Sequence, residues 1–172
     1  MAKVAFILDQ MYEDSEFRVP YDRVKEAGHE PVVIGLESGK KLEGKSDGDT
    51  VTTEKAISDV SADEFAALVI PGGYSPDKIR TDAKMVQLTK NIFDAGKPVA
   101  AICHAGWMLA EADIVKNKTV TSWPSIKTDL INAGAEWVDQ EVVEDGNLIT
   151  SRKPDDLEAF TKALLSQIEQ TT

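Results

Sequence analysis

The sequence predicts a doubly wound α/β fold, in which a mostly parallel sheet lies between two layers of helices. Short apolar runs alternate with segments of helical periodicity along nearly the whole chain, which is the pattern of repeated βαβ units. The run at 98–103 is apolar at every position, as a central parallel strand covered on both faces requires. No repeat, linker or low-complexity tract divides the chain, so we expect a single domain over residues 1–172.

The expected strands are short apolar or alternating runs bounded by glycine, proline or polar turn residues. An exposed excursion at 37–55, rich in Gly, Lys, Asp and Thr, is expected to add short strands around Leu42 and Val51. The other expected strands cover residues 3–8, 31–35, 67–70, 98–103, 119–121, 136–138, 142–143 and 148–150.

The expected helices carry apolar residues at three- and four-residue spacing, with start or stop signals at their ends. Asp82 caps one helix, Gly28 ends another, and Pro154 opens the last one. In order, the expected helices cover residues 12–27, a short segment after the capping box at 61–64, then 82–96, 104–112, 125–133 and a final stretch from 154 onward.

The charge balance excludes several classes of partner. The chain has 19 basic and 30 acidic residues, a net charge of −11, so nucleic acids and anionic membranes would be repelled. No apolar segment approaches the roughly 20 residues of a membrane span, and the first apolar run is too short for a signal peptide. One cysteine leaves no internal disulfide, which agrees with a cytoplasmic location.

Cys103 is the expected reactive centre, because it lies where a buried strand turns into a helix. Such a turn needs small neighbours, and the sequence supplies Ala101, Ala105 and Gly106. The positive end of the helix is expected to lower the pKa of the thiol and favour the thiolate. An inert buried thiol is the alternative, and the small residues at the turn argue against it.

Three further positions complete the expected site at the carboxyl ends of the strands. Glu13 is expected to hold or relay the thiol proton, although a solvated acid at a helix start is also consistent with the sequence. The backbone amides of Gly73 and His104 are expected to donate to an oxyanion, although a glycine pair also makes a plain turn. Because no histidine follows His104, an acting imidazole must be His104, and Asp77 is a candidate acid to orient it.

Neither a metal nor a cofactor is expected. The single cysteine and the two histidines do not have zinc-ligand spacing. Residues 39–46 match the phosphate-loop pattern G-x-x-x-x-G-K-[ST] letter by letter, but that mechanism needs a helix at the Lys-Ser end. The residues that follow, Asp47-Gly48-Asp49-Thr50, disfavour a helix and add negative charge, so we expect no nucleotide there.

Several motifs together resemble the PfpI-type intracellular cysteine protease family, in the superfamily that also holds protein deglycases, glyoxalases and stress chaperones. The resemblance covers almost the whole chain. It rests on Tyr12-Glu13-Asp14-Ser15-Glu16, Ile70-Pro71-Gly72-Gly73, Ala100-Ala101-Ile102-Cys103-His104-Ala105, Thr121-Ser122-Trp123-Pro124, residues 132–138 and Ser151-Arg152.

The resemblance implies a flavodoxin-like fold, a homo-oligomer of at least two chains, Cys103 as nucleophile, Glu13 as its carboxyl partner and His104 as the neighbouring imidazole. In protease members a glutamate of a neighbouring subunit meets the histidine. The matching position here is Asp77, which is one methylene shorter, and Ala105 replaces the glycine common after Cys-His. These departures favour carbonyl chemistry over proteolysis.

Three functions are consistent with these features. The first is a hydrolase-type stress protein whose Cys103 thiolate attacks carbonyl groups, in deglycation of proteins or detoxification of small α-oxoaldehydes. The second is an intracellular cysteine peptidase. The third is a stress protein without turnover, either a redox sensor whose thiolate is oxidised or a chaperone in which Cys103 is residual.

Overall fold

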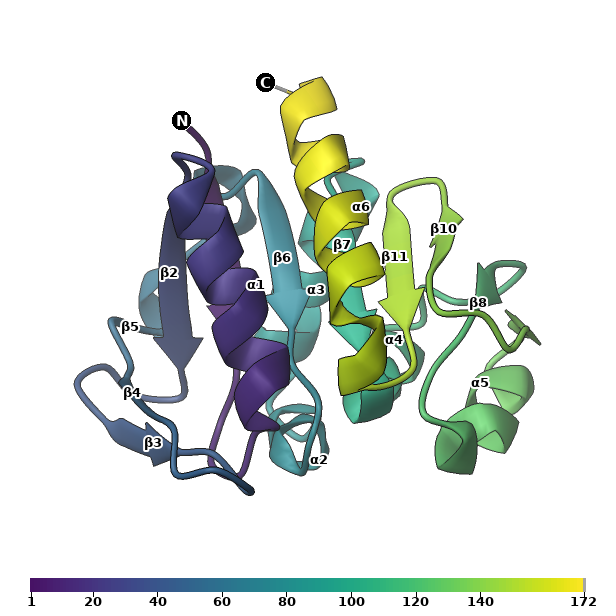
Figure 1. Cartoon of the computed structure of the whole chain (residues 1–172), viewed down its shortest axis with the longest axis horizontal. Helices are drawn as coiled ribbons and strands as arrows, with labels where there is room; N and C mark the ends of the chain where they lie inside the picture. Colours follow the sequence, from purple (N-terminus) through teal and green to yellow (C-terminus); the bar gives the residue numbers. More distant parts are fainter. Residues whose placement is uncertain (172) are drawn as a thin grey trace.

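A computed structural model describes residues 1–171, and it places a central sheet between two layers of helices (Figure 1). The strands are β1 (Lys3–Ile7), β2 (Glu30–Gly35), β3 (Lys41–Glu43), β4 (Thr50–Thr52), β5 (Lys55–Ala56), β6 (Ala67–Ile70), β7 (Val99–Ile102), β8 (Thr119–Val120), β9 (Glu136–Trp137), β10 (Val143–Asp145) and β11 (Leu148–Ser151).

The main sheet has seven strands in the order β10-β11-β7-β6-β1-β2-β5. Its neighbouring pairs are parallel except for β10 and β11, which form an antiparallel hairpin at one edge. The predicted mostly parallel sheet is therefore confirmed. The excursion at 37–55 contains the antiparallel pair β3–β4, as expected, and β8 and β9 form a separate parallel pair beside the main sheet.

The α-helices are α1 (Asp14–Glu26), α2 (Ser75–Ile79), α3 (Ala83–Asp94), α4 (Gly106–Glu111), α5 (Lys127–Asn132) and α6 (Leu157–Thr171). Five single 3₁₀ turns are η1 (Ile57–Asp59), η2 (Ala62–Glu64), η3 (Cys103–Ala105), η4 (Pro124–Ile126) and η5 (Pro154–Asp156). The sequence did not predict α2, which follows the Pro71-Gly72-Gly73 turn. The capping box at Ser61 starts only the 3₁₀ turn η2.

The two faces of the sheet carry separate apolar cores. Helices α1 and α6 lie side by side over one face, where Phe17 and Phe160 are fully buried (Figure 1). Helices α3 and α4 cover the opposite face. Strand β7 serves both cores, because Ala101 points to the α3–α4 side and Ile102 to the α1–α6 side. This alternation explains why a strand buried on both faces is apolar at every position.

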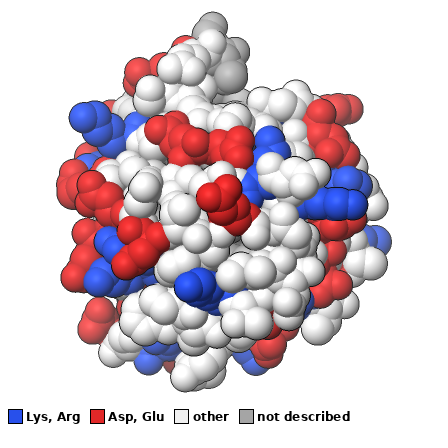
Figure 2. Space-filling view, turned by 90° about the vertical axis from the view of Figure 1, so that its right-hand side faces the viewer, with Lys and Arg blue, Asp and Glu red and all other residues white. Residues whose placement is uncertain are grey.

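The surface carries charges of both signs. Figure 2 shows acidic and basic side chains interspersed on the face that includes β8, β10 and α5, with a neutral area in its lower half. No helix in residues 1–171 is both long enough and apolar enough to cross a membrane.

Candidate active site

The loops after β1, β6 and β7 meet at one edge of the sheet, as the sequence predicts. The amide of Glu13 donates to the carbonyl of Gly72 at 3.1 Å, and the amide of Tyr74 donates to the carbonyl of Met11 at 2.9 Å. These bonds join the loop after β1 to the loop after β6. Since parallel strands present their carboxyl ends at the same edge, Cys103, which follows β7, lies at this edge beside the other two loops.

Cys103 lies just beyond the end of β7, in a left-handed backbone conformation with φ of 62°. Ile102 before it is still extended, with φ of −125°, so the chain turns sharply at the cysteine. A left-handed conformation costs a non-glycine residue about 1–2 kcal/mol, which the surrounding structure must offset. Its carbonyl accepts from the amide of Trp123 at 3.3 Å. The predicted sharp turn at the thiol is therefore present.

Two backbone amides point at the sulfur. Those of His104 and Gly73 donate to Cys103, and each lowers the pKa of the thiol. Gly73 adopts φ of 81°, and a Cβ there would come within 2.5 Å of the amide nitrogen of Glu13 and 2.6 Å of the carbonyl of Met11. Only glycine fits this position, so its amide can approach the sulfur closely. The pair has the arrangement that an oxyanion hole needs.

Glu16 is the carboxyl group that contacts the thiol. It lies on the inner side of α1 and is fully buried, and its Oε1 accepts from the amide of Gly72 at 2.9 Å. Burial, followed by the charge of Glu13, raises the pKa of Glu16 to about 8, while interactions with the amide of Gly72 and the thiol of Cys103 partly lower it. Oε2 has no regular hydrogen bond to any of residues 1–171, so it can carry the proton.

The thiol pKa differs from the sequence expectation. Burial raises the pKa of Cys103 above its ordinary value, and the nearby charge of Glu16 raises it further. The two backbone amides and Lys45 act in the expected direction but do not compensate for these effects. The expectation of a lowered thiol pKa is therefore corrected. A thiolate forms only when Glu16 holds the proton, because two neighbouring buried anions are strongly disfavoured.

Glu13 lies in the same cavity but has a different partner. Its Oε2 is 3.1 Å from Nζ of Lys45 and 3.4 Å from Oγ of Ser46. The expected position of a carboxyl group against the thiol is thus occupied by Glu16, three residues further along the chain. A sequence signal for Glu16 exists, because it lies on the same helix face as Pro20 and Val24, which are also buried in α1.

His104 lies beside the sulfur rather than turned away from it. Its Nδ1 is 3.4 Å from Sγ of Cys103, and its Nε2 is 3.3 Å from Oγ of Ser125. Burial, with a smaller contribution from Lys45, lowers the pKa of His104, so the neutral imidazole is favoured. Its ring centroid lies 5.1 Å from that of Trp107, which packs against it.

Asp77 lies apart from this group within the single chain. It is an exposed residue of α2 and does not line the cavity that holds Cys103 and His104. The predicted contact of Asp77 with His104 across a subunit interface stays a prediction.

A cavity of about 290 Å³ opens over the sulfur. Sequence reasoning did not identify Lys45, Trp123 or Pro154 as members of this site. The cavity is lined by Glu13, Glu16, Lys45, Gly73, Cys103, His104, Trp123 and Pro154. It combines a nucleophile, two carboxyl groups, an imidazole and a cation. Within residues 1–171, no group of three or more His, Cys, Asp or Glu side chains is placed to hold a metal ion.

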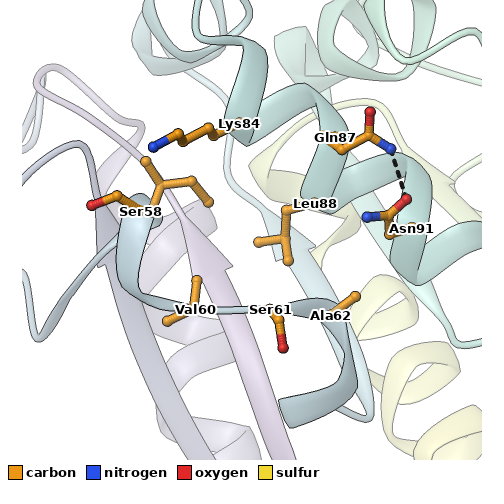
Figure 3. A pocket seen from close by; sticks show the side chains of 9 residues that line it. Ser58, Val60, Ser61, Ala62, Lys84, Gln87, Leu88 and Asn91 are labelled. Carbon is orange, nitrogen blue, oxygen red and sulfur yellow. Dashed lines mark hydrogen bonds between the residues drawn. The ribbon is translucent and has the colours of Figure 1, made fainter.

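A second hollow of about 220 Å³ lies between the η1–η2 segment and α3 (Figure 3). Its titratable lining residue is Lys84, and Leu88 points into it between serine and amide side chains. Nε2 of Gln87 donates to Oδ1 of Asn91 at 2.7 Å, so these two amides partly satisfy each other. This hollow has no thiol, carboxyl group or imidazole in its lining, and the cavity at Cys103 is the candidate active site.

The phosphate-loop pattern at 39–46 does not fold as a phosphate loop. Its middle forms strand β3 (Lys41–Glu43), and the chain then turns into β4 instead of starting a helix. The backbone amides of Ser46, Asp47 and Asp49 donate to the carboxylate of Asp14 at 2.9, 3.0 and 2.9 Å. These amides are already occupied by an internal anion, which supports the expectation that no nucleotide binds there.

Comparison with known proteins identifies close relatives of the whole chain. The sequence matches the model of the DJ-1/PfpI family over residues 2–167. It is 46% identical to the Bacillus subtilis protein named "Putative cysteine protease YraA" over 97% of this chain and 98% of that protein. It is 44% identical to protein/nucleic acid deglycase 2 of Escherichia coli, over 95% of each chain.

A solved structure shows the same fold. A two-domain protein of Anabaena variabilis, with DJ-1/ThiJ/PfpI-like and ferritin-like domains, superimposes with a TM-score of 0.96 at 41% identity. The match covers 98% of this chain and 48% of that one.

Proposed function

We propose that this chain, which belongs to the DJ-1/PfpI family, is an enzyme that uses Cys103 to attack carbonyl carbon atoms. The reaction class we favour is deglycation of proteins or detoxification of small α-oxoaldehydes, and one relative bears the name of a deglycase. The observation that carries the proposal is the contact between Cys103 and the buried carboxyl of Glu16, whose pKa is raised to about 8. A carboxyl group that holds a proton near neutral pH suits an acid–base catalyst.

The proposed reaction begins from the form of the pair in which Glu16 has lost its proton, and the Cys103 proton then moves to the Glu16 carboxylate. The thiolate attacks the carbonyl carbon, the S–C bond forms, and the π electron pair moves to the oxygen. The amides of Gly73 and His104 stabilise this oxyanion, because they already point at the sulfur. Glu16 then returns the proton to the oxygen, which gives a neutral hemithioacetal and restores the carboxylate.

For an α-oxoaldehyde, a further proton transfer completes the turnover. Removal of the proton from the former aldehyde carbon, with protonation of the adjacent carbonyl oxygen, gives an enediol. Protonation of the adjacent carbon and loss of the hydroxyl proton from the former aldehyde carbon then give a thioester of a 2-hydroxy acid. Water hydrolyses this thioester and releases the free thiol. Glu16 is the group we assign to this proton transfer, because it is the carboxyl in contact with the sulfur.

A cysteine peptidase is the second candidate, supported by the name of a Bacillus relative and by the 3.4 Å approach of His104 Nδ1 to the sulfur. Peptide hydrolysis requires protonation of a leaving amine, which His104 would supply. The partner of its Nε2 in this chain is the hydroxyl of Ser125 rather than a carboxylate. We propose that the chain forms a homo-oligomer of at least two copies, in which Asp77 of a neighbouring chain meets His104.

We propose a single catalytic domain over residues 1–172, working in the cytoplasm on small carbonyl compounds or glycated proteins. The family match over nearly the whole chain and the net charge of −11 support this proposal.

The direct test is conversion of methylglyoxal, followed by proton NMR of the product. Wild type is expected to form the 2-hydroxy acid, and the Cys103→Ala variant is expected to fall to the rate in buffer. Equal rates for both proteins would exclude the proposal. Cleavage of a fluorogenic peptide, lost in the same variant, would instead favour the peptidase.

A further inference from the structure

The loop at 44–49 is fixed to the start of α1 by one buried carboxylate. Asp14 is 3% exposed and accepts the backbone amides of Ser46, Asp47 and Asp49. These bonds lower the pKa of Asp14 against the opposing effect of burial, so the carboxylate stays charged. Three amide donors converging on one ionised carboxylate form a strong, directional anchor.

Two further contacts restrict the same loop. A Cβ at Gly44 would overlap the carboxyl group of Asp14, so glycine is required for this close approach. Oδ2 of Asp49 accepts from the hydroxyl of Tyr12 at 2.8 Å, and its Oδ1 accepts from Nε of Arg18 at 3.1 Å. The loop therefore has little freedom to move away from α1.

The residue that this loop presents to the active-site cavity is Lys45. Its Nζ lies 3.1 Å from Oε2 of Glu13 and 5.6 Å from the ring centroid of Tyr74. The other titratable groups that face it are Cys103, Glu16 and His104, and its positive charge lowers the pKa of all three. Lys45 is thus the cation that borders the thiol.

We infer that Asp14 is a positioning residue for the reaction: by binding the backbone of the loop at 44–49, it holds the Lys45 ammonium group where it assists ionisation of Cys103. The end of the segment that resembles a phosphate loop, together with the turn that follows it, thus donates its amides to an internal carboxylate. The inference rests on the proposed role of Cys103 as a nucleophile. Its test needs no substrate, so it can fail or succeed independently of carbonyl turnover.

The test is the pH dependence of alkylation by iodoacetamide, followed by intact mass, since Cys103 is the only cysteine. We expect Asp14→Asn to move the midpoint of the rate upward by about half a pH unit or more, because Lys45 is no longer held in place. Removal of a nearby negative charge alone would move the midpoint downward. The direction of the shift therefore separates positioning from direct electrostatics.

Matched variants complete the experiment. Lys45→Gln is expected to shift the midpoint upward, whereas Lys45→Arg, which keeps the positive charge, is expected to leave it unchanged. The double variant Asp14→Asn, Lys45→Gln is expected to shift the midpoint by no more than the larger of the two single-variant shifts. Asp47→Asn, which removes an exposed acid from the same loop, controls for charge alone and is expected to give no upward shift. If Asp14→Asn does not fold, Gly44→Ala displaces the loop from Asp14 and is expected to give the same upward shift.

An unchanged midpoint in Lys45→Gln overturns the inference. A lower melting temperature of Asp14→Asn with an unchanged or lower midpoint also overturns it, because that result assigns Asp14 a purely structural role.

Discussion

The carboxyl group of Glu16 interacts with the thiol of Cys103 in a place that water scarcely reaches. Each group disfavours ionisation of the other, so with the pKa of Glu16 raised to about 8 the pair is mostly doubly protonated at pH 7, and loss of one proton leaves a single negative charge and one proton that the two groups share. The backbone enforces this contact, because a Cβ at Gly72 would overlap Oε1 of Glu16 and come within 2.9 Å of Cβ of Cys103. The proposed reaction uses this shared proton, which moves from the thiol to the carboxylate and then to the substrate oxygen.

The buried carboxyl of Glu16 makes the stability of the protein depend on pH. The pKa of Glu16 is raised from 4.5 to about 8, so between these values the folded chain holds a proton that the unfolded chain has released. The free energy of unfolding therefore falls as pH rises through this window, by at most about 1.4 kcal/mol per pH unit from this group. Urea unfolding at pH 5, 6, 7 and 8 measures the slope.

The control for this slope is Glu16→Gln, which keeps the shape but does not titrate. Its stability relative to wild type is expected to increase steadily from pH 5 to pH 8. A constant difference between the two proteins across that range would show that Glu16 is already ionised in the folded state.

The left-handed conformation of Cys103 predicts an unusual effect of glycine. Because φ is 62°, Cys103→Gly is expected to be more stable than Cys103→Ala by about 1 kcal/mol. At Ala101, in the regular strand β7, substitution by glycine is expected to destabilise by at least about 0.5 kcal/mol. Thermal unfolding of the three variants measures both effects. A Cys103→Gly variant less stable than Cys103→Ala would refute strain at the turn.

The internal anchor at Asp14 predicts that nucleotides do not bind the segment at 39–46. The amides at the Gly-Lys-Ser end of this segment are already occupied, because Ser46 donates to Asp14 while Gly44 and Lys45 donate to backbone carbonyls. The acidic side chains of Asp47 and Asp49 also repel a polyanion. Titration of the wild-type protein with Mg·ATP in a calorimeter is expected to give only heats of dilution. A saturable heat that Lys45→Gln removes would contradict this account of the loop.

The sequence was sufficient for the fold and for the position of Cys103 at a sharp turn, because both depend on local patterns. The apolar run at 98–103 and the small residues after it predict a central strand and a sharp turn, and the structure contains both. The edge at which the three loops meet also follows from parallel topology.

The identity of the carboxyl partner did not follow from local pattern. Glu13 and Glu16 both belong to the start of α1, and only the packing of α1 on the sheet decides which one is buried against the thiol. Lys45 comes from a hairpin 58 residues before Cys103 in the sequence, and its place depends on the contact of that hairpin with Asp14. The pKa of the thiol was predicted in the wrong direction because burial outweighs the amides at the turn.

The central claim is that Glu16, rather than Glu13, moves the proton for Cys103. The most direct measurement compares the methylglyoxal turnover of Glu16→Gln with that of Glu13→Gln, at pH 7 and with each variant shown to be folded. The account predicts a decrease of about 100-fold or more in kcat for Glu16→Gln and a small change for Glu13→Gln. A large loss in Glu13→Gln with near-normal turnover in Glu16→Gln would contradict it.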